Sequence, residues 1–271
     1  MNPLADTLHR LGPAAEGLSL VARPGDRVVP ADRLIQRKRD LESTVDAFAR
    51  NVGTREQAVA ASLLAQTWAA SVTRAAIGCL ASERRVPDMA ASNSALLFDL
   101  TGRPVGVTLA APRFAALAGD SASSDPAAEA VPDLATLLAW TRQRTFDRHL
   151  GPLVDALSAI APVGRRLLWG NVAAACAGAF AALSVNGVDP NRLEADALAL
   201  LDAPDAPTRG LAHLLRVEHE GRTHLFVRRE TCCLYNRLPH APSCLSCRLL
   251  DEEDRRQRVT FRLEALRSPA R

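Results

Sequence analysis

Four of the six cysteines in this 271-residue chain lie in one short stretch, TCCLYNRLPHAPSCLSC, at residues 231–247. Their spacing is C-C-x10-C-x2-C, formed by Cys232, Cys233, Cys244 and Cys247. A secreted disulfide framework would distribute its cysteines along the chain, whereas a metal site gathers them. The chain is therefore expected to fold so that these thiols meet at a metal centre, in a reduced, cytoplasmic compartment.

The adjacent pair Cys232–Cys233 bears on the kind of metal. Neighbouring side chains on an extended backbone point to opposite faces, so adjacent thiols do not easily chelate one ion. Structural zinc sites normally use two spaced pairs. A two-iron cluster is larger, and sulfurs that diverge from a kink can reach it, while Cys244 and Cys247 have the spacing of a common metal knuckle. The pattern favours an iron–sulfur centre and leaves zinc open, whereas a redox dithiol would leave the adjacent pair unexplained.

Composition narrows the class of protein. The hydrophobic fraction of 48% is enough for a packed core, and the formal net charge of +3 gives no indication of a nucleic-acid partner. The start, MNPLADTLHRLGPAAEG, lacks the cationic segment and long apolar run of an exported leader. Cys79 and Cys176 lie among small apolar residues, which predicts buried, inert thiols.

One segment, Leu167–Val188, is nearly long enough to span a bilayer. It is rich in alanine and is interrupted by Gly170, Asn171 and Gly178. Small residues four positions apart suit close helix packing in a protein core as well as in lipid. We therefore predict a buried helix and no stable membrane insertion.

The hydrophobic pattern predicts a mainly α (α+β) fold, with a helical core, two short β-hairpins and a C-terminal iron–sulfur cluster loop. Thr54 and Gln57 have the spacing of a capping box, which predicts a long helix that starts at Thr54. Further expected elements are hairpins over 95–114 and 214–230 and helices over 132–148, from 152, from 189 and over 251–267. The expected regions are a loosely organised lead-in (1–53) with a charged helical stretch near 34–50, a helix plus hairpin (54–118), a linker (119–130), a helical region ending in a hairpin (131–230) and the cluster motif with a terminal helix (231–271).

The stretch RRETCCLYNRLPHAPSCLSC at residues 228–247 closely resembles the C-terminal motif of ferric-siderophore reductases of the FhuF type. That motif has two adjacent cysteines, ten residues and then C-x2-C, with arginines before it and a tyrosine and an arginine within it. HLGPLVDAL at 149–157 and LLWGNVAAA at 167–175 also look like family segments, so the likeness covers most of the chain from residue 54 onward. The loop CLSCRL departs from many relatives, which have a glycine after the third cysteine and a proline after the fourth.

The resemblance implies a [2Fe-2S] cluster whose ligands are Cys232, Cys233, Cys244 and Cys247. It also implies one-electron reduction of a ferric siderophore, with the electron coming from an unidentified donor. Siderophores hold Fe(III), a hard ion, far more tightly than Fe(II), so reduction releases the metal. The candidate electrostatic or docking residues are Arg228, Arg229, Arg237, Arg248 and Tyr235. Their plain alternative is solvated surface side chains in an arginine-rich protein.

Two other classes of protein stay open: a zinc-stabilised ligand-binding module, and an iron–sulfur protein that binds or senses a siderophore without turnover. The helical part is also loosely similar to the accessory domain of siderophore synthetases, but the chain shows no nucleotide-binding motif. His219, His224 and His240 flank the cysteines and are expected on the hairpin or loop surface. Trp169 and Asn171 are expected in the helix core.

Overall fold

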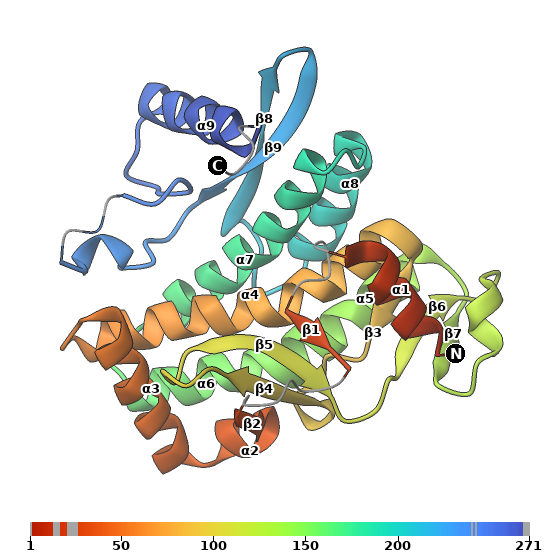
Figure 1. The fold of residues 1–271 in the computed structure, drawn as a ribbon, viewed down its shortest axis with the longest axis horizontal. Helices are drawn as coiled ribbons and strands as arrows, with labels where there is room; N and C mark the ends of the chain where they lie inside the picture. The colour runs from red at the N-terminus through yellow and green to blue at the C-terminus, as the bar shows by residue number, and fades with distance from the viewer. Residues whose placement is uncertain (1, 13–16, 21–26, 240, 242, 268–271) are drawn as a thin grey trace.

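The computed structural model describes residues 2–12, 17–20, 27–239, 241 and 243–267 (Figure 1). Within these residues the protein is mainly helical, with three small β-sheets, which confirms the predicted mainly α (α+β) class. Two long helices, α4 (Gln57–Glu83) and α7 (Arg165–Val185), lie side by side through the middle. Both are apolar around most of their circumference, as expected of helices that are covered on all sides.

The start of α4 differs from the prediction. The helix begins at Gln57, because Thr54 Oγ1 accepts a hydrogen bond from the backbone N–H of Glu56 (3.1 Å) and so closes a local turn. Gln57 does not complete a capping box either. Its Nε2 donates to Asp46 Oδ1 (2.7 Å) on the preceding helix, α3 (Lys38–Val52).

The helical stretch expected near residues 34–50 is confirmed as α3, and the rest of the lead-in is more ordered than predicted. The lead-in contains α1 (Pro3–Leu11), α2 (Ala31–Gln36) and α3, and its apolar side chains, such as Leu4 and Leu41, are fully buried in the common core. It also supplies two strands, β1 (Leu18–Ser19) and β2 (Arg27–Pro30). These strands are two to four residues long, which is too short for a recognisable alternating pattern.

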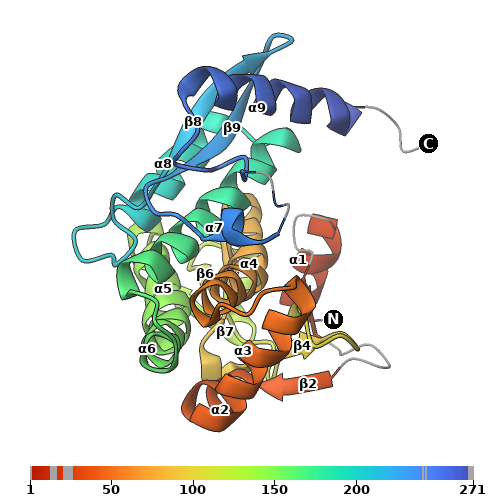
Figure 2. The same cartoon turned by 90° about the vertical axis from the view of Figure 1, so that its left-hand side faces the viewer.

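The first predicted hairpin is confirmed as β4 (Ser94–Phe98) and β5 (Pro104–Leu109). It forms the centre of a four-stranded sheet with the order β1-β5-β4-β2, in which only β1 and β5 are parallel. Figure 2 shows this sheet on one side of α4 and α7.

Residues 119–130, expected as a linker, are part of the packed structure. A short 3-10 helix, η3 (Ser121–Ser124), leads to β7 (Ala128–Val131), which pairs with β6 (Phe114–Leu117) and, through it, with β3 (Arg85–Pro87). The guanidinium of Arg85 binds Asp120 Oδ1 at 2.8 Å, and Ala122 is buried. The composition of residues 119–130 is typical of a loop and did not predict the strand β7. The proposed boundary between regions at this segment stays a prediction.

The helices expected over 132–148 and from 152 form one continuous helical run. It consists of α5 (Leu134–Arg142), the π-helical segment η4 (Gln143–Leu150) and α6 (Gly151–Ile160). Asp133 caps its start, since Asp133 Oδ1 accepts from the N–H of Thr136 at 2.7 Å. Gly151 fits the wider turn closely, because a Cβ there would lie 3.0 Å from the carbonyl oxygen of Phe146.

Within the described part of the chain, α7 is the one helix with the length and apolar character needed to cross a membrane. In this fold, 72% of its apolar window is buried. The residues that follow fit the predicted elements well. Asp189 caps α8 (Pro190–Leu201) through the N–H of Asn191 at 3.0 Å.

The second predicted hairpin, β8 (Ala212–His219) and β9 (Arg222–Arg229), turns at Glu220 and Gly221, which have φ values of 50° and 72°. Two left-handed residues suit a tight hairpin turn. The terminal helix α9 (Glu252–Arg267) starts where predicted, with Asp251 Oδ1 accepting from the N–H of Asp254 at 2.7 Å. The hairpin and α9 lie on the side of α7 opposite the four-stranded sheet (Figures 1 and 2).

Candidate metal centre

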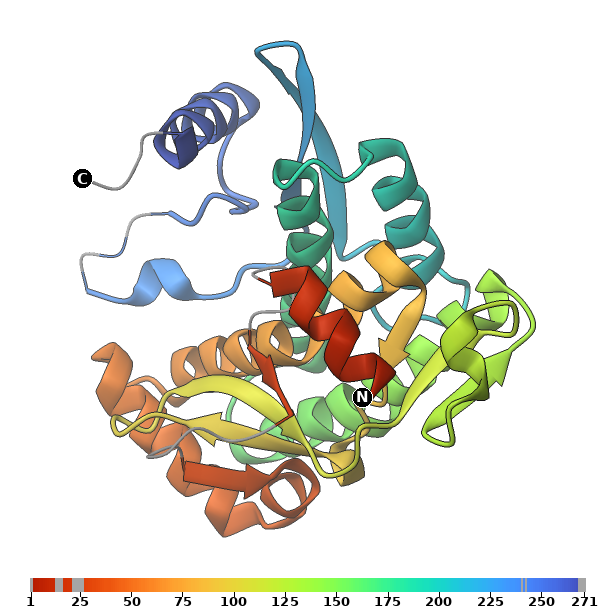
Figure 3. The ribbon, with the colours of Figure 1, turned by 45° about the vertical axis from the view of Figure 1, so that its right-hand side comes forward.

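Strand β9 delivers the chain directly to the first two cysteines. Figure 3 shows the segment from the end of β9 through the short helix η5 (Tyr235–Arg237) to α9, along one side of the molecule. The chain kinks at Leu234, which has a left-handed φ of 65°. The returning segment lies against the end of β9, because the N–H of Arg229 donates to the carbonyl of Ser246 at 3.3 Å.

The fold brings Cys233 and Cys244 together. Their Sγ atoms lie 4.0 Å apart, and the side chain of Cys233 is buried. Two thiolates on one tetrahedral metal ion, with metal–sulfur bonds of about 2.3 Å, lie roughly 3.8 Å apart. A disulfide would require about 2.05 Å. The observed separation therefore fits two ligands of one iron or zinc ion.

The sequence predicted a knuckle formed by Cys244 and Cys247, and its backbone turn is present, with the N–H of Cys247 donating to the carbonyl of Cys244 at 2.9 Å. However, the sulfur found in contact with that of Cys244 belongs to Cys233, while Cys247 is buried and Cys232 is half-buried. Across the described residues, no three His, Cys, Asp or Glu side chains gather closely enough to hold a metal ion. Joint ligation by all four thiols stays a prediction.

The two neighbouring thiols differ in acidity. The contact between the two sulfurs lowers the pKa of Cys233, and the positive charge of Arg229 acts in the same direction against the effect of burial. The same interaction raises the pKa of Cys244. A lowered pKa favours the thiolate form of Cys233, which is the form that binds metals. By contrast, burial raises the pKa of Cys176 to about 12, as expected of an inert core thiol.

Arg229 is a buried cation with neutral partners. Its guanidinium donates to Asn171 Oδ1 at 2.8 Å and to Gln66 Oε1 at 3.3 Å, and its Nε has no partner. The side chain is 1% exposed, and no carboxylate among the described residues forms an ion pair with it. A buried charge is costly unless an opposite charge compensates it. An anionic centre held by thiolates would be that counter-charge, so the donor set and its surroundings fit a thiolate-ligated cluster.

A buried hydrogen-bond network connects this cation to the cysteines. Asn171 Nδ2 donates to Ser62 Oγ at 2.9 Å, and Ser62 Oγ donates to the carbonyl of Cys233 at 2.8 Å. The prediction that Asn171 lies in the helix core is confirmed, whereas sequence reasoning missed Ser62 and Gln66. Ser62 and Gln66 are four positions apart on one face of α4, and this spacing is the signal that could have revealed them.

Gly170 permits the close approach of α7 to the chain ahead of the cysteines. A Cβ at this position would lie 1.8 Å from Thr231 Oγ1 and 2.8 Å from two further atoms of the same side chain. On the other side of the loop, Arg255 of α9 was also missed. Its Nη1 donates to the carbonyl of Cys247 at 3.1 Å, and its Nη2 donates to that of Leu250 at 2.9 Å. The cysteine segment is thus held between α7 and α9.

The remaining candidate docking residues are exposed, and two of the three arginines are in ion pairs. Arg228 pairs with Glu230 at 3.1 Å, whereas Arg248 is exposed beside Cys232. Arg237 pairs with Glu56 at 2.7 Å at the start of α4. Tyr235 is 37% exposed.

The two flanking histidines that the structure describes, His219 and His224, belong to no metal-binding group. His219 and His224 are half-buried on the hairpin, and His219 Nε2 is 3.9 Å from Glu220. His240 lies outside the described residues. Trp169 packs edge-on against Phe146, with ring centroids 6.3 Å apart, which confirms its place in the core.

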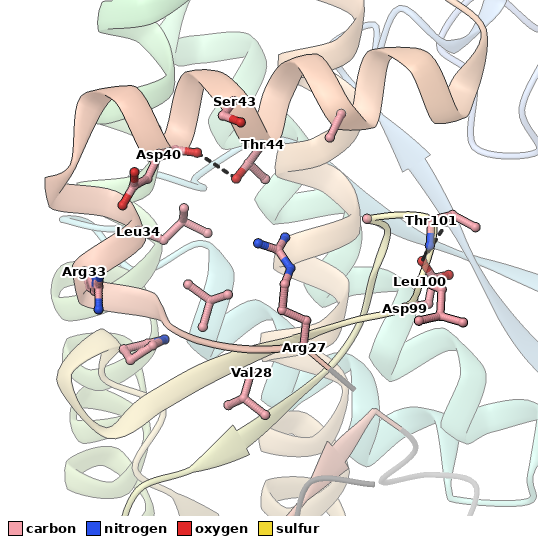
Figure 4. Close-up of a pocket in the computed structure, with 14 residues that line it drawn as sticks. Arg27, Val28, Arg33, Leu34, Asp40, Ser43, Thr44, Asp99, Leu100 and Thr101 are labelled. Atoms are coloured by element: carbon pink, nitrogen blue, oxygen red, sulfur yellow. Dashed lines mark hydrogen bonds between the residues drawn. The ribbon is translucent and has the colours of Figure 1, made fainter. Parts of the chain in front are cut away.

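Two large cavities differ in their chemistry. One, of about 830 Å³, is lined by Cys232 and several basic side chains. The other, of about 760 Å³, lies between α3, β2 and the β4–β5 turn, where Arg27 extends into it (Figure 4). No cysteine or histidine lines the second cavity, and its polar groups bond locally, as in the hydrogen bond from Thr44 Oγ1 to the carbonyl of Asp40 at 2.8 Å. The first cavity is therefore the one associated with the metal centre.

Among solved structures, the aerobactin synthetase IucC from a hypervirulent pathotype of Klebsiella pneumoniae is similar, with a TM-score of 0.49 and 13% identity. The match covers 68% of this chain and 33% of that chain, so the chain spans about a third of the synthetase. No curated protein matches the chain significantly. A family model described as "Ferric iron reductase FhuF-like transporter" matches residues 62–231, which is more than half of the chain and ends directly before Cys232. The chain belongs to this FhuF-like ferric iron reductase family.

Proposed function

We propose that this protein is a cytoplasmic ferric-siderophore reductase that transfers one electron at a time from a [2Fe-2S] cluster to chelated Fe(III). The cluster ligands in this proposal are Cys232, Cys233, Cys244 and Cys247. Family membership supports reduction of ferric iron, and the thiol pair at 4.0 Å supports metal ligation. An external one-electron donor protein supplies each electron, and each electron converts one chelated Fe(III) to Fe(II).

The observation that carries the proposal is the buried guanidinium of Arg229. Zinc bound by four thiolates would also be anionic, but it does not change charge. When bound, a [2Fe-2S] cluster accepts and donates single electrons and becomes more negative on reduction. A fixed, desolvated cation beside Cys233 stabilises the more negative state. The surrounding acceptors from Gln66 and Asn171 hold the cation in place without neutralising it.

The protein itself need not provide a catalytic acid or base. Siderophore oxygens bind Fe(III) far more tightly than Fe(II), so the affinity for the metal falls once the electron arrives. The tasks of the chain are to hold the cluster, to exclude water from Cys233 and Cys247, and to leave one ligand near the surface. Cys232 and Cys244 are both half-buried, and of the two Cys232 lines a cavity.

The test is an anaerobic reoxidation experiment. Protein reduced with dithionite and freed of excess reductant is mixed with ferrioxamine B and a chromogenic ferrous chelator. We expect about one Fe(II) per reoxidised cluster. The absorbance of the cluster and that of the ferrous–chelator complex should change with the same time course. Cys233→Ser should abolish ferrous release, whereas Cys79→Ala, at a buried thiol outside the site, should keep it.

Two results would favour the alternatives. A coloured protein that binds the chelate but is not reoxidised by it would be a siderophore-binding or sensing protein. A colourless protein with one zinc ion, which unfolds when the zinc is chelated, would be a zinc-stabilised binding module.

A further inference from the structure

The cavity of about 830 Å³ beside Cys232 is named here the basic cavity. Its chemically active lining consists of Arg166, His213, Arg228, Glu230, Cys232 and Arg248. We propose that the basic cavity binds a ferric chelate of net negative charge, such as a catecholate or carboxylate complex, and that Cys232 is the cluster ligand nearest to it. This inference rests on the proposed function and specifies its substrate class.

The charges of the basic cavity are only partly compensated. Glu230 Oε1 is its one carboxylate oxygen in contact with a base, at 3.1 Å from Arg228 and 3.4 Å from His213 Nε2. Within the described residues, Arg166 and Arg248 make no hydrogen bond and no ion pair. The cavity thus holds three guanidinium groups against one carboxylate, and two of the three have unused donors.

The position of Arg166 at the N-terminus of α7 also favours a negatively charged ligand. It lies in the first turn of α7, a 21-residue helix whose N-terminus carries partial positive charge. Gly164, the N-cap residue, provides no side-chain acceptor. The neighbouring Arg165 is paired with Asp155, whereas Arg166 is not paired. Arg166 is exposed, so its charge at the positive end of the helix costs little in the free protein, and a bound anion would interact favourably with both charges.

The size and position of the basic cavity suit electron transfer to a bound chelate. Small-molecule sites typically have volumes of about 300–1,000 Å³. Of the four clustered cysteines, only Cys232 lines the basic cavity, while Cys233 and Cys247 are buried. A chelate in the cavity would therefore contact the edge of the centre without displacing the buried ligands.

The experiment measures binding separately from electron transfer. Gallium(III) complexes mimic ferric complexes in charge and shape but cannot be reduced. Calorimetric titration of the cluster-loaded protein would use a gallium tris-catecholate, with a charge of −3, and a neutral gallium trihydroxamate. Arg166→Gln and Arg248→Gln should each weaken tris-catecholate binding about 3- to 10-fold at low salt, since each removes one charge near the ligand. Binding of the neutral complex should change less than about 2-fold, because a neutral ligand has no net charge for a guanidinium to attract.

A matched pair at Gly164 separates charge from shape and from folding. An added Cβ at this position meets no atom within 4 Å, and both Asp and Asn are good N-caps. Gly164→Asp should therefore keep the fold and weaken tris-catecholate binding at least about 3-fold relative to Gly164→Asn, since only Asp places a negative charge in the cavity.

The inference is overturned if the Arg166→Gln/Arg248→Gln variant binds the tris-catecholate as tightly as the wild type, or if both gallium complexes lose affinity equally. Iron and sulfide contents of the same preparations keep this outcome distinct from failure of the proposed function. A normal cluster with unaltered chelate binding removes the cavity assignment alone. Absence of a cluster removes the reductase and, with it, this inference.

Discussion

Substitution of Gly170 by alanine tests whether α7 fixes the chain that leads into the cysteines. The new Cβ would lie 1.8 Å from Thr231 Oγ1 and 2.8 Å from Thr231 Cβ and Cγ2, so the Thr231 side chain must rotate and the two segments must separate until these contacts reach about 3.0 Å. Overpacking of this kind costs about 1–3 kcal/mol. Weakening the Arg229–Asn171 and Ser62–Cys233 hydrogen bonds adds about 1 kcal/mol each.

Alanine also has an opposing, favourable effect, because it stabilises a helix interior by about 1 kcal/mol relative to glycine. The net expectation is a loss of about 2–4 kcal/mol in the free energy of unfolding. The measurement is urea unfolding followed by circular dichroism. Gly178→Ala on the same helix is the matched control. Its Cβ would meet nothing within 4 Å, so it should be neutral or slightly stabilising.

A double-mutant cycle makes the prediction refutable. Thr231→Ala removes the atom at 1.8 Å and one of the two at 2.8 Å, so it should recover at least half of the loss caused by Gly170→Ala. If Gly170→Ala were as stable as Gly178→Ala, or if the two substitutions were additive, the close approach of α7 and Thr231 would be wrong.

Three further substitutions address charge and anchoring. Arg229→Met should lower the reduction potential of the cluster-loaded protein by about 100 mV, because it removes a buried charge that acts on Cys233 where the effective dielectric constant is near 20. Arg228→Met, at an exposed site, should shift the potential far less in a potentiometric titration. His149 is fully buried, and burial lowers its pKa to about 4 from 6.5, so the unfolded state binds the proton more tightly. Stability should therefore fall by up to about 3 kcal/mol as the pH drops from 6.5 to 4, and His149→Asn should show a shallower slope in urea unfolding over this range; an equal slope would contradict the assignment. Arg255→Met should remove the two hydrogen bonds to the carbonyls of Cys247 and Leu250 and so loosen the cysteine segment. The variant should lose iron to a chelator faster than the control Arg256→Met.

Elements fixed by local chemistry could be predicted from the sequence. Asp189 before Pro190, the Glu220–Gly221 turn and the acidic start of α9 each specify a boundary through neighbouring residues, and all three are confirmed. Elements that depend on distant partners could not. β7 lies in a Ser-, Asp- and Ala-rich stretch and becomes a strand only because β6 pairs with it.

The candidate site shows the same division. Clustered cysteines identify the segment by spacing alone, and the small residue at Gly170 indicates close packing without revealing that Thr231 is its partner. Adjacent residues of one strand face opposite sides, so the sequence indicates that Arg228 and Arg229 differ in burial but not which of them is buried. Arg229 is buried and Arg228 is exposed, and only the tertiary structure decides which arginine affects the thiols.

The most direct test of the central claim is the metal content of anaerobically purified protein. Iron, acid-labile sulfide and zinc would be quantified alongside the visible spectrum. The account predicts about two irons and two sulfides per chain, visible absorbance that bleaches with dithionite, and loss of both elements in Cys233→Ser. One zinc ion per chain without sulfide would contradict it and would make the cysteine segment a structural clasp.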